Sequence, residues 1–302
     1  ILREVEEDAR RRFGDKIEID LVGKIKDGKV MADQGIIAGC SGGTYDNLAE
    51  AASILKDKSV GNDYFTISAY PQSVPVYMAA TRDNIAAEML QAGVVIKPAF
   101  CGPCFGAGDV PSNNGLSIRH TTRNFPNREG SKPGQGQISL VALMDARSIA
   151  ATAANGGVIT AATDVEYTNE HNPYKYNGNI YRNRVFNGYG CENPDEELRY
   201  GPNIKDWPKM YPMQENMLLE LAAVIHDPVT TTDELIPSGE TSSYRSNPLK
   251  LSEFALSRRV PEYVGISKRI QNEDLERRDG KRPADVKAVM DRVGAPVADT
   301  SL

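Results

Sequence analysis

Apolar and polar residues follow two alternating patterns through the first half of the chain. Residues 45–57 and 74–93 carry apolar side chains at helical spacing, and the second segment ends at a glycine, as helices commonly do. Residues 136–157 have the pattern of a strand followed by an alanine-rich helix. Strands that alternate with helices predict an α/β domain with a mostly parallel sheet. The predicted buried strands include the short apolar runs 34–40, 64–70 and 94–100.

The pattern changes after about residue 163. Residues 166–212 are rich in Asn, Tyr, Gly and Pro and show little periodicity, which predicts a long irregular connector that packs its tyrosines on the main domain. A new unit begins at about residue 213, and its charged tail has the pattern of surface helices over 267–294. The sequence therefore predicts three parts, which are an α/β domain over 1–163, an irregular linker over 164–212 and a further unit over 213–302.

The composition excludes several classes of protein. Of the 302 residues, 40% are hydrophobic and 25% are charged, as in a globular protein with a core. A net charge of -6, without a run of lysines, argues against nucleic acid as a partner. No apolar stretch approaches the roughly 18 residues that a membrane span needs, and the charged N-terminus does not resemble a secretory signal. We expect a cytoplasmic protein that binds neither a membrane nor nucleic acid.

Cysteines provide the first sign of chemistry. Cys40 and Cys101 each directly follow a predicted strand, and ligands bind at the carboxyl ends of parallel strands. Cys104 completes a Cys-Gly-Pro-Cys motif, whereas Cys191 is interpreted as structural. A structural zinc site is disfavoured because it needs four ligands. The residues alone leave two interpretations open, which are a redox pair of two thiols and an iron–sulfur cluster with one open iron.

Arginines follow the paired cysteines. Arg119, Arg123 and Arg128 lie among Gly, Asn and Thr residues. The planar guanidinium fork fits carboxylates, so an arginine cluster beside a metal site suggests an anionic, carboxylate-bearing ligand. The histidines lack the spacing of metal ligands, and we expect no catalytic or ligand role for His120, His171 and His226.

Five motifs, in order, resemble the aconitase and isopropylmalate isomerase superfamily. The first three are the A-G-C-S-G-G turn at 38–43, the paired-cysteine motif C-G-P-C-F-G-A-G-D at 101–109 and T-T-R-N-F-P-N-R-E-G at 121–130. The other two resemble the family's linker, G-P-N-I-K-D-W-P at 201–208, and the opening of its mobile swivel domain at 230–247. The resemblance implies a three-layer α/β/α iron–sulfur domain over 1–163 and a partial swivel domain over 213–302, in a divergent protein similar to aconitate hydratase.

The same resemblance implies the chemistry. Cys40, Cys101 and Cys104 match the three ligands of a [4Fe–4S] cluster, whose fourth iron acts as a Lewis acid on the substrate. The arginines that match the residues at the substrate carboxylates are Arg123, Arg128 and, in the swivel domain, Arg245. The implied activity is that of a hydro-lyase, which moves water across a carbon–carbon double bond of a small di- or tricarboxylic acid.

The sequence also departs from the family pattern. Gly42 and Thr122 replace two Asn residues, Glu234 replaces a His, and the swivel-domain serine that acts as the catalytic base has no match. We therefore expect a fragment of a longer protein that has no catalytic residue of its own, is inactive alone and needs the remaining aconitase-type domains. The alternative is a module without catalysis, either a cluster-binding sensor or a cluster-free relic.

Overall fold

The chain divides into two compact units, Ile1–Glu192 and Asn193–Leu302, and the division falls inside the segment predicted as a linker. Each unit is described by itself. The computed structural model describes residues 1–14, 18–60, 64–106, 108–122, 138–168, 170–197, 199–227, 230–237, 241–281, 284–294 and 300–301.

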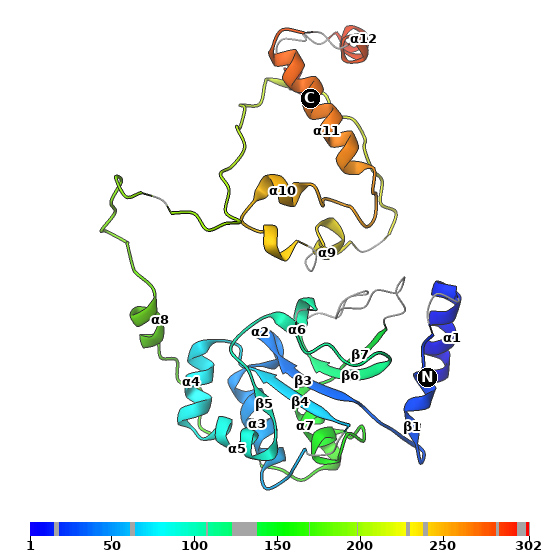
Figure 1. Ribbon diagram of the computed structural model, residues 1–302, viewed down its shortest axis with the longest axis vertical. Coiled ribbons are helices and arrows are strands. Elements are labelled where there is room, and N and C mark those ends of the chain that lie inside the picture. Colours follow the sequence, from blue (N-terminus) through cyan, green and yellow to red (C-terminus); the bar gives the residue numbers. More distant parts are fainter. Residues whose placement is uncertain are drawn as a thin grey trace. The chain divides into compact units, whose positions relative to one another are not determined.

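A five-stranded sheet forms the centre of the first unit (Figure 1). Its strand order is β5-β4-β3-β6-β7, and all neighbouring strands are parallel. The α/β class and the parallel sheet predicted from the alternating pattern are therefore confirmed. The strands are β3 (Gln34–Ala38), β4 (Thr66–Tyr70), β5 (Val95–Ile96), β6 (Gly115–His120) and β7 (Ser139–Leu143).

One face of the sheet is apolar and carries the main helices. Ile37 and Ile118 point from the sheet into this core, where Ile149 of a covering helix is also fully buried. Gly35 allows the close approach, because a Cβ there would lie 2.9 Å from Cγ2 of Ile149. The helices are α3 (Tyr45–Leu55) and α7 (Ala146–Ala154) on the sheet, with α4 (Val74–Arg82) and α5 (Ile85–Ala92) packed beside α3.

The opposite face of the sheet is mixed, because Ile36, Ala38 and Tyr70 form a small buried cluster beside polar side chains of β6. Side chains alternate between the two faces of a strand, so Ser117 and Arg119 point away from the core that holds Ile118. Both are nevertheless buried, because α6 (Gly102–Phe105) and the residues after it cover this face. The face that carries the polar side chains is therefore the face beneath the paired cysteines.

The N-terminal helix α1 (Leu2–Phe13) is anchored through a buried carboxylate. Glu6 accepts a hydrogen bond from the backbone of Val22 at 3.0 Å and pairs with Arg10 at 2.8 Å. The elements that follow α1 are η2 (Val22–Lys24) and the antiparallel pair β1 (Ile25–Lys26) and β2 (Lys29–Val30).

After α7 the first unit continues as η4 (Ala162–Asp164), irregular chain and α8 (Asn179–Arg184). The ring of Tyr174 lies 5.6 Å from that of Tyr45 in α3, whereas Tyr189 is exposed. The packing of this segment on the main domain stays a prediction, which the contact between Tyr174 and Tyr45 supports.

The second unit is mostly helical where it is regular. The charged tail predicted to be helical corresponds to α11 (Tyr263–Arg278) and α12 (Ala284–Val293). No helix in the described parts of the chain is both long and apolar enough to cross a membrane. The other elements of this unit are β8 (Asn216–Met217), α9 (Thr232–Leu235), η5 (Ser242–Tyr244), α10 (Pro248–Ser252) and β9 (Thr300–Ser301).

The apolar face predicts a contrast between two strand residues. Ile118→Ala should lower the free energy of unfolding by about 2–5 kcal/mol, because it leaves a cavity beneath α7. Leu143→Ala on the adjacent strand should change it by about 0.5 kcal/mol or less, because Leu143 is 56% exposed. Denaturant titration followed by circular dichroism measures both. Equal losses in the two variants would contradict this placement of the core.

Candidate functional site

The three predicted ligand cysteines lie beyond the carboxyl ends of two strands of the sheet, β3 and β5, which are separated by β4 (Figure 1). Cys40 lies in the short helix α2 (Gly39–Gly42), directly after β3, and is exposed. Cys101, after β5, is exposed and precedes α6, whereas Cys104 within α6 is only 4% exposed. The two cysteine motifs therefore lie at the same edge of the sheet, because the carboxyl ends of parallel strands meet there.

The three thiols are close enough to affect one another. Burial raises the pKa of the Cys104 thiol, and a hydrogen bond with Cys101 and the charge of Cys40 act in the same direction. The turn after β3 touches α6 directly, because a Cβ on Gly39 would lie 3.1 Å from Sγ of Cys104. The structure thus brings Cys40 together with the paired cysteines, 61 and 64 residues further along the chain.

Thr122 connects two of these cysteines. Its hydroxyl lies 3.0 Å from Sγ of Cys40 and 3.5 Å from the hydroxyl of Ser41. Its backbone forms a hydrogen bond with Cys104, which partly offsets the effect of burial on the pKa of that thiol. Thr122 replaces the Asn of the family pattern, and its shorter side chain still reaches Cys40.

Gly42 is required by the packing of the turn that holds Cys40. A Cβ at this position would lie 2.0 Å from the backbone oxygen of His120, so no side chain fits without a backbone shift. The side chain of Asn47 in α3 fixes the same turn by donating to the backbone oxygens of Ser41 at 2.9 Å and Gly42 at 3.1 Å. Sequence reasoning missed Asn47, because on its own it is an ordinary polar residue in the first turn of a helix.

Arg119 does not join an anion-binding cluster. Its side chain is only 1% exposed and lies under the segment that carries the paired cysteines. It donates hydrogen bonds to the backbone oxygens of Pro103 at 3.3 Å and Asp109 at 3.0 Å. The expectation that Arg119 contributes to ligand binding is therefore wrong, because its donors are directed into the protein interior.

Asp109 closes the segment that carries the paired cysteines. Its carboxylate pairs with Lys97 at 2.9 Å and accepts hydrogen bonds from the hydroxyls of Tyr70 and Ser68. Burial alone raises the pKa of Asp109, but the hydrogen bonds from Tyr70 and Lys97 outweigh it, so the pKa is lowered. The carboxylate is thus ionised at neutral pH and ties the carboxyl end of this segment to β4 and to Lys97, which directly follows β5.

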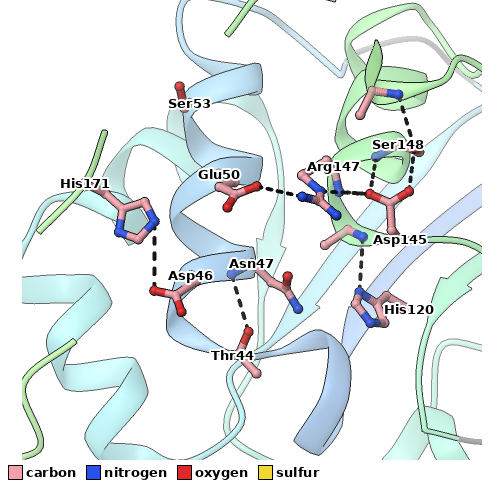
Figure 2. Close-up of polar contacts among 12 residues, drawn as sticks. Thr44, Asp46, Asn47, Glu50, Ser53, His120, Asp145, Arg147, Ser148 and His171 are labelled. Carbon is pink, nitrogen blue, oxygen red and sulfur yellow. Dashed lines mark hydrogen bonds and ion pairs between the residues drawn. The ribbon is translucent and has the colours of Figure 1, made fainter. Parts of the chain in front are cut away.

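Two of the histidines have structural contacts (Figure 2). Nδ1 of His120 accepts a hydrogen bond at 3.1 Å from the backbone of Ala146 at the start of α7, and burial lowers the pKa of His120. The ring of His171 packs edge-on against Tyr45, and its Nε2 lies 3.9 Å from Asp46. His226 is exposed in the second unit. These contacts account for His120 and His171 without a catalytic role.

The other residues singled out in the sequence either stay predictions or have contacts of their own. Arg123 and Arg128 lie outside the described residues. Arg245 is exposed after η5 in the second unit, so its role stays a prediction. Glu234, in the same unit, accepts a hydrogen bond from the backbone of Thr231 at 2.7 Å and forms a capping box at the start of α9. Cys191 is exposed.

The paired cysteines differ from a thioredoxin-like redox pair. Helix α6 after Cys101 is only four residues long, which is not the full helix that a thioredoxin-like pair opens. Within the described parts of the chain, no three His, Cys, Asp or Glu side chains form a group that could hold a metal ion.

Comparison with known proteins agrees with the motifs. Residues 3–151 match the model of the aconitase family (aconitate hydratase). This segment, which contains the whole parallel sheet and the three cysteines, belongs to the aconitase and isopropylmalate isomerase superfamily.

Similar curated proteins include large subunits of 3-isopropylmalate dehydratase. That of Nitratidesulfovibrio vulgaris (strain DP4) is 32% identical over 140 residues, which are 46% of this chain and 31% of the relative. That of Helicobacter hepaticus is 28% identical over 139 residues, again 46% of this chain and 31% of the relative. That of Methanopyrus kandleri is 31% identical over 121 residues, or 40% of this chain and 29% of the relative. The chain thus spans about a third of the length of these relatives.

The crowding around Gly42 gives a testable prediction. Gly42→Asn, which restores the family residue, should lower the free energy of unfolding by about 1–3 kcal/mol, because the new Cβ meets backbone. The control is Gly28→Asn in the turn between β1 and β2, where a Cβ meets nothing within 4 Å and the left-handed backbone suits Asn. Denaturant titration compares the two variants. If both unfold alike, the turn has more space than the structure assigns to it.

Proposed function

We propose that this chain carries the cluster-binding domain of a hydro-lyase of the aconitase family. Such an enzyme removes water from, and returns it to, a small di- or tricarboxylic hydroxy acid. The observation that carries the proposal is the grouping of Cys40, Cys101 and Cys104 at the carboxyl edge of the parallel sheet. The match of residues 3–151 to the family supports it independently.

The donor set suits a [4Fe–4S] cluster better than a single metal ion. In such a cluster each cysteine thiolate binds its own iron, so the three sulfurs need not converge on one point. Cys40, Cys101 and Cys104 would hold three irons, and the fourth iron would have no protein ligand. When the cluster is bound, this open iron supplies Lewis-acid chemistry at the substrate. Thr122 supports the fit, because it forms hydrogen bonds with two of the three cysteines.

The substrate would be held by arginines. Thr122 lies just after the carboxyl end of β6. Arg123 is the next residue in the sequence, and Arg128 follows five residues later. Their guanidinium forks, with that of Arg245 from the swivel unit, match carboxylates in bidentate geometry. A substrate with two or three carboxylates would engage all three side chains. The proposed substrate class, a small di- or tricarboxylic acid, rests on the match of guanidinium groups to carboxylates in charge and shape.

The isolated chain is proposed to lack turnover. We assign 164–212 to a linker and 213–302 to the start of a swivel domain, and neither provides a match for the catalytic serine. The other aconitase-type domains of the parent protein would supply that base. The alternative is a module that holds or has lost the cluster without catalysis, and the two experiments below separate these functions.

Cluster binding is tested by anaerobic reconstitution with iron and sulfide. We expect a broad brown absorbance and close to four irons per chain, as a [4Fe–4S] cluster requires. Cys40→Ser, Cys101→Ser and Cys104→Ser should each lose it, because each removes one thiolate ligand. Cys191→Ser is the matched control and should keep it, since Cys191 is exposed outside the site. No absorbance in the parent chain, or an equal loss in the Cys191 variant, would reject the ligand assignment.

Catalysis is tested on the reconstituted chain with cis-aconitate and an alkyl-substituted maleate. We expect no hydration of either double bond, because no residue of this chain matches the catalytic base. The measurement is the loss of double-bond absorbance over time. The full-length parent protein, assayed in the same way, should hydrate one of them. Clear turnover by the chain alone would disprove the fragment hypothesis, and an iron-loaded but inactive parent would favour the sensor.

A further inference from the structure

A cation lies buried beneath the paired cysteines. Arg119 is among the largest fully buried side chains of the described residues, at 1% exposure. It extends from β6 on the polar face of the sheet, where α6 and the chain after it cover it. Burying a charged group is costly unless hydrogen bonds satisfy it. The hydrogen bonds of Arg119 therefore show which part of the protein the buried guanidinium stabilises.

Those contacts join the cysteine segment to two strands. One terminal nitrogen donates to the backbone oxygen of Pro103, the residue before Cys104, at 3.3 Å. The other donates to the backbone oxygen of Asp109 at 3.0 Å and to Oε1 of Gln34 on β3 at 3.2 Å. Nε donates to the hydroxyl of Ser117 on β6 at 2.8 Å. A single guanidinium thus spans both ends of the segment from Pro103 to Asp109.

The shape of the contact requires arginine. The planar fork presents several N–H donors in fixed directions, whereas the ammonium of lysine is a compact point charge. A lysine at position 119 would keep the charge but would not reach Pro103, Asp109 and Gln34 together. Geometry and charge can therefore be separated by substitution. The ion pair with Lys97 holds the side chain of Asp109, and Arg119 holds its backbone oxygen, so both contacts fix the same end of the segment.

We propose that Arg119 is a positioning residue that holds Cys101 and Cys104 in the geometry that binds the cluster and offsets the cluster's negative charge. The inference rests on the proposed function, since it assigns a ligand role to these cysteines. A cluster with three thiolate ligands is anionic and gains a further negative charge on reduction. A buried cation beneath it, in a low-dielectric setting, favours the reduced form.

The first test measures the segment without any cluster. Hydrogen exchange is followed at the amides of Cys104 and Gly106, which are hydrogen-bonded to the oxygens of Cys101 and Gly102. Arg119→Met and Arg119→Lys should both speed this exchange about tenfold, because both lose the fork. Arg147→Met is the matched control and should leave it unchanged, since Arg147 on α7 pairs with Asp145 and Glu50 (Figure 2).

The second test measures the reduction potential of the reconstituted cluster. Arg119→Met should lower it by about 59 mV, which corresponds to a tenfold change for a one-electron couple. Arg119→Lys should shift it by much less, because the charge remains. A residue with only a structural role would change stability and leave the potential at its original value.

The outcomes separate this inference from the proposed function. If the unsubstituted chain takes up no iron, the proposed function fails. The hydrogen-exchange data then show by themselves whether Arg119 holds the segment that carries the paired cysteines. If Arg119→Met leaves both exchange and potential unchanged, the inference is overturned. Should Arg119→Met fail to fold by circular dichroism, Ser117→Ala replaces it, because it removes one acceptor of Arg119 and should speed exchange to a smaller extent. Unchanged exchange in Ser117→Ala and Arg119→Lys would then overturn the inference.

Discussion

The turn after β3 has no room for side chains at its glycines, and the position of Cys40 depends on this constraint. A Cβ on Gly42 would lie 2.0 Å from the backbone oxygen of His120, and one on Gly43 would lie 2.0 Å from that of Tyr70. The turn is therefore held between the ends of β4 and β6 by backbone contact. Cys40, two residues before Gly42 in the same turn, is therefore placed by the sheet itself, which is more rigid than a loop.

The two faces of the sheet serve different purposes. The face under α3 and α7 is apolar, and hydrophobic burial there supplies the main driving force for folding. The face under α6 buries polar side chains beside a small apolar cluster, and Arg119 and Asp109 hold the cysteine segment there through hydrogen bonds and an ion pair. Directional contacts of this kind fix orientation, which burial of apolar area alone does not. The domain thus separates the source of its stability from the geometry of its site.

The difference between the faces also explains what the sequence reveals. Apolar periodicity located β3 before Cys40, because burial leaves a local pattern. The buried strand predicted over 94–100 is only the edge strand Val95–Ile96, and Val95 is 51% exposed. The roles of Arg119 and Asn47 had no such signal, since their partners are set by three-dimensional contact and each residue looks like ordinary surface charge or polarity. Glu234 is intermediate, because Thr231 three residues before it forms a recognisable capping box.

The three departures from the family pattern have local physical explanations. Gly42 is imposed by the backbone of His120, Thr122 keeps contact with Cys40, and Glu234 caps the start of α9. Burying a charge is costly unless hydrogen bonds satisfy it, and the hydrogen bonds of Arg119 go to the sheet and to the segment of the paired cysteines. The cost of this buried charge is therefore offset where the cysteines are held, which is the basis of the positioning role proposed for Arg119.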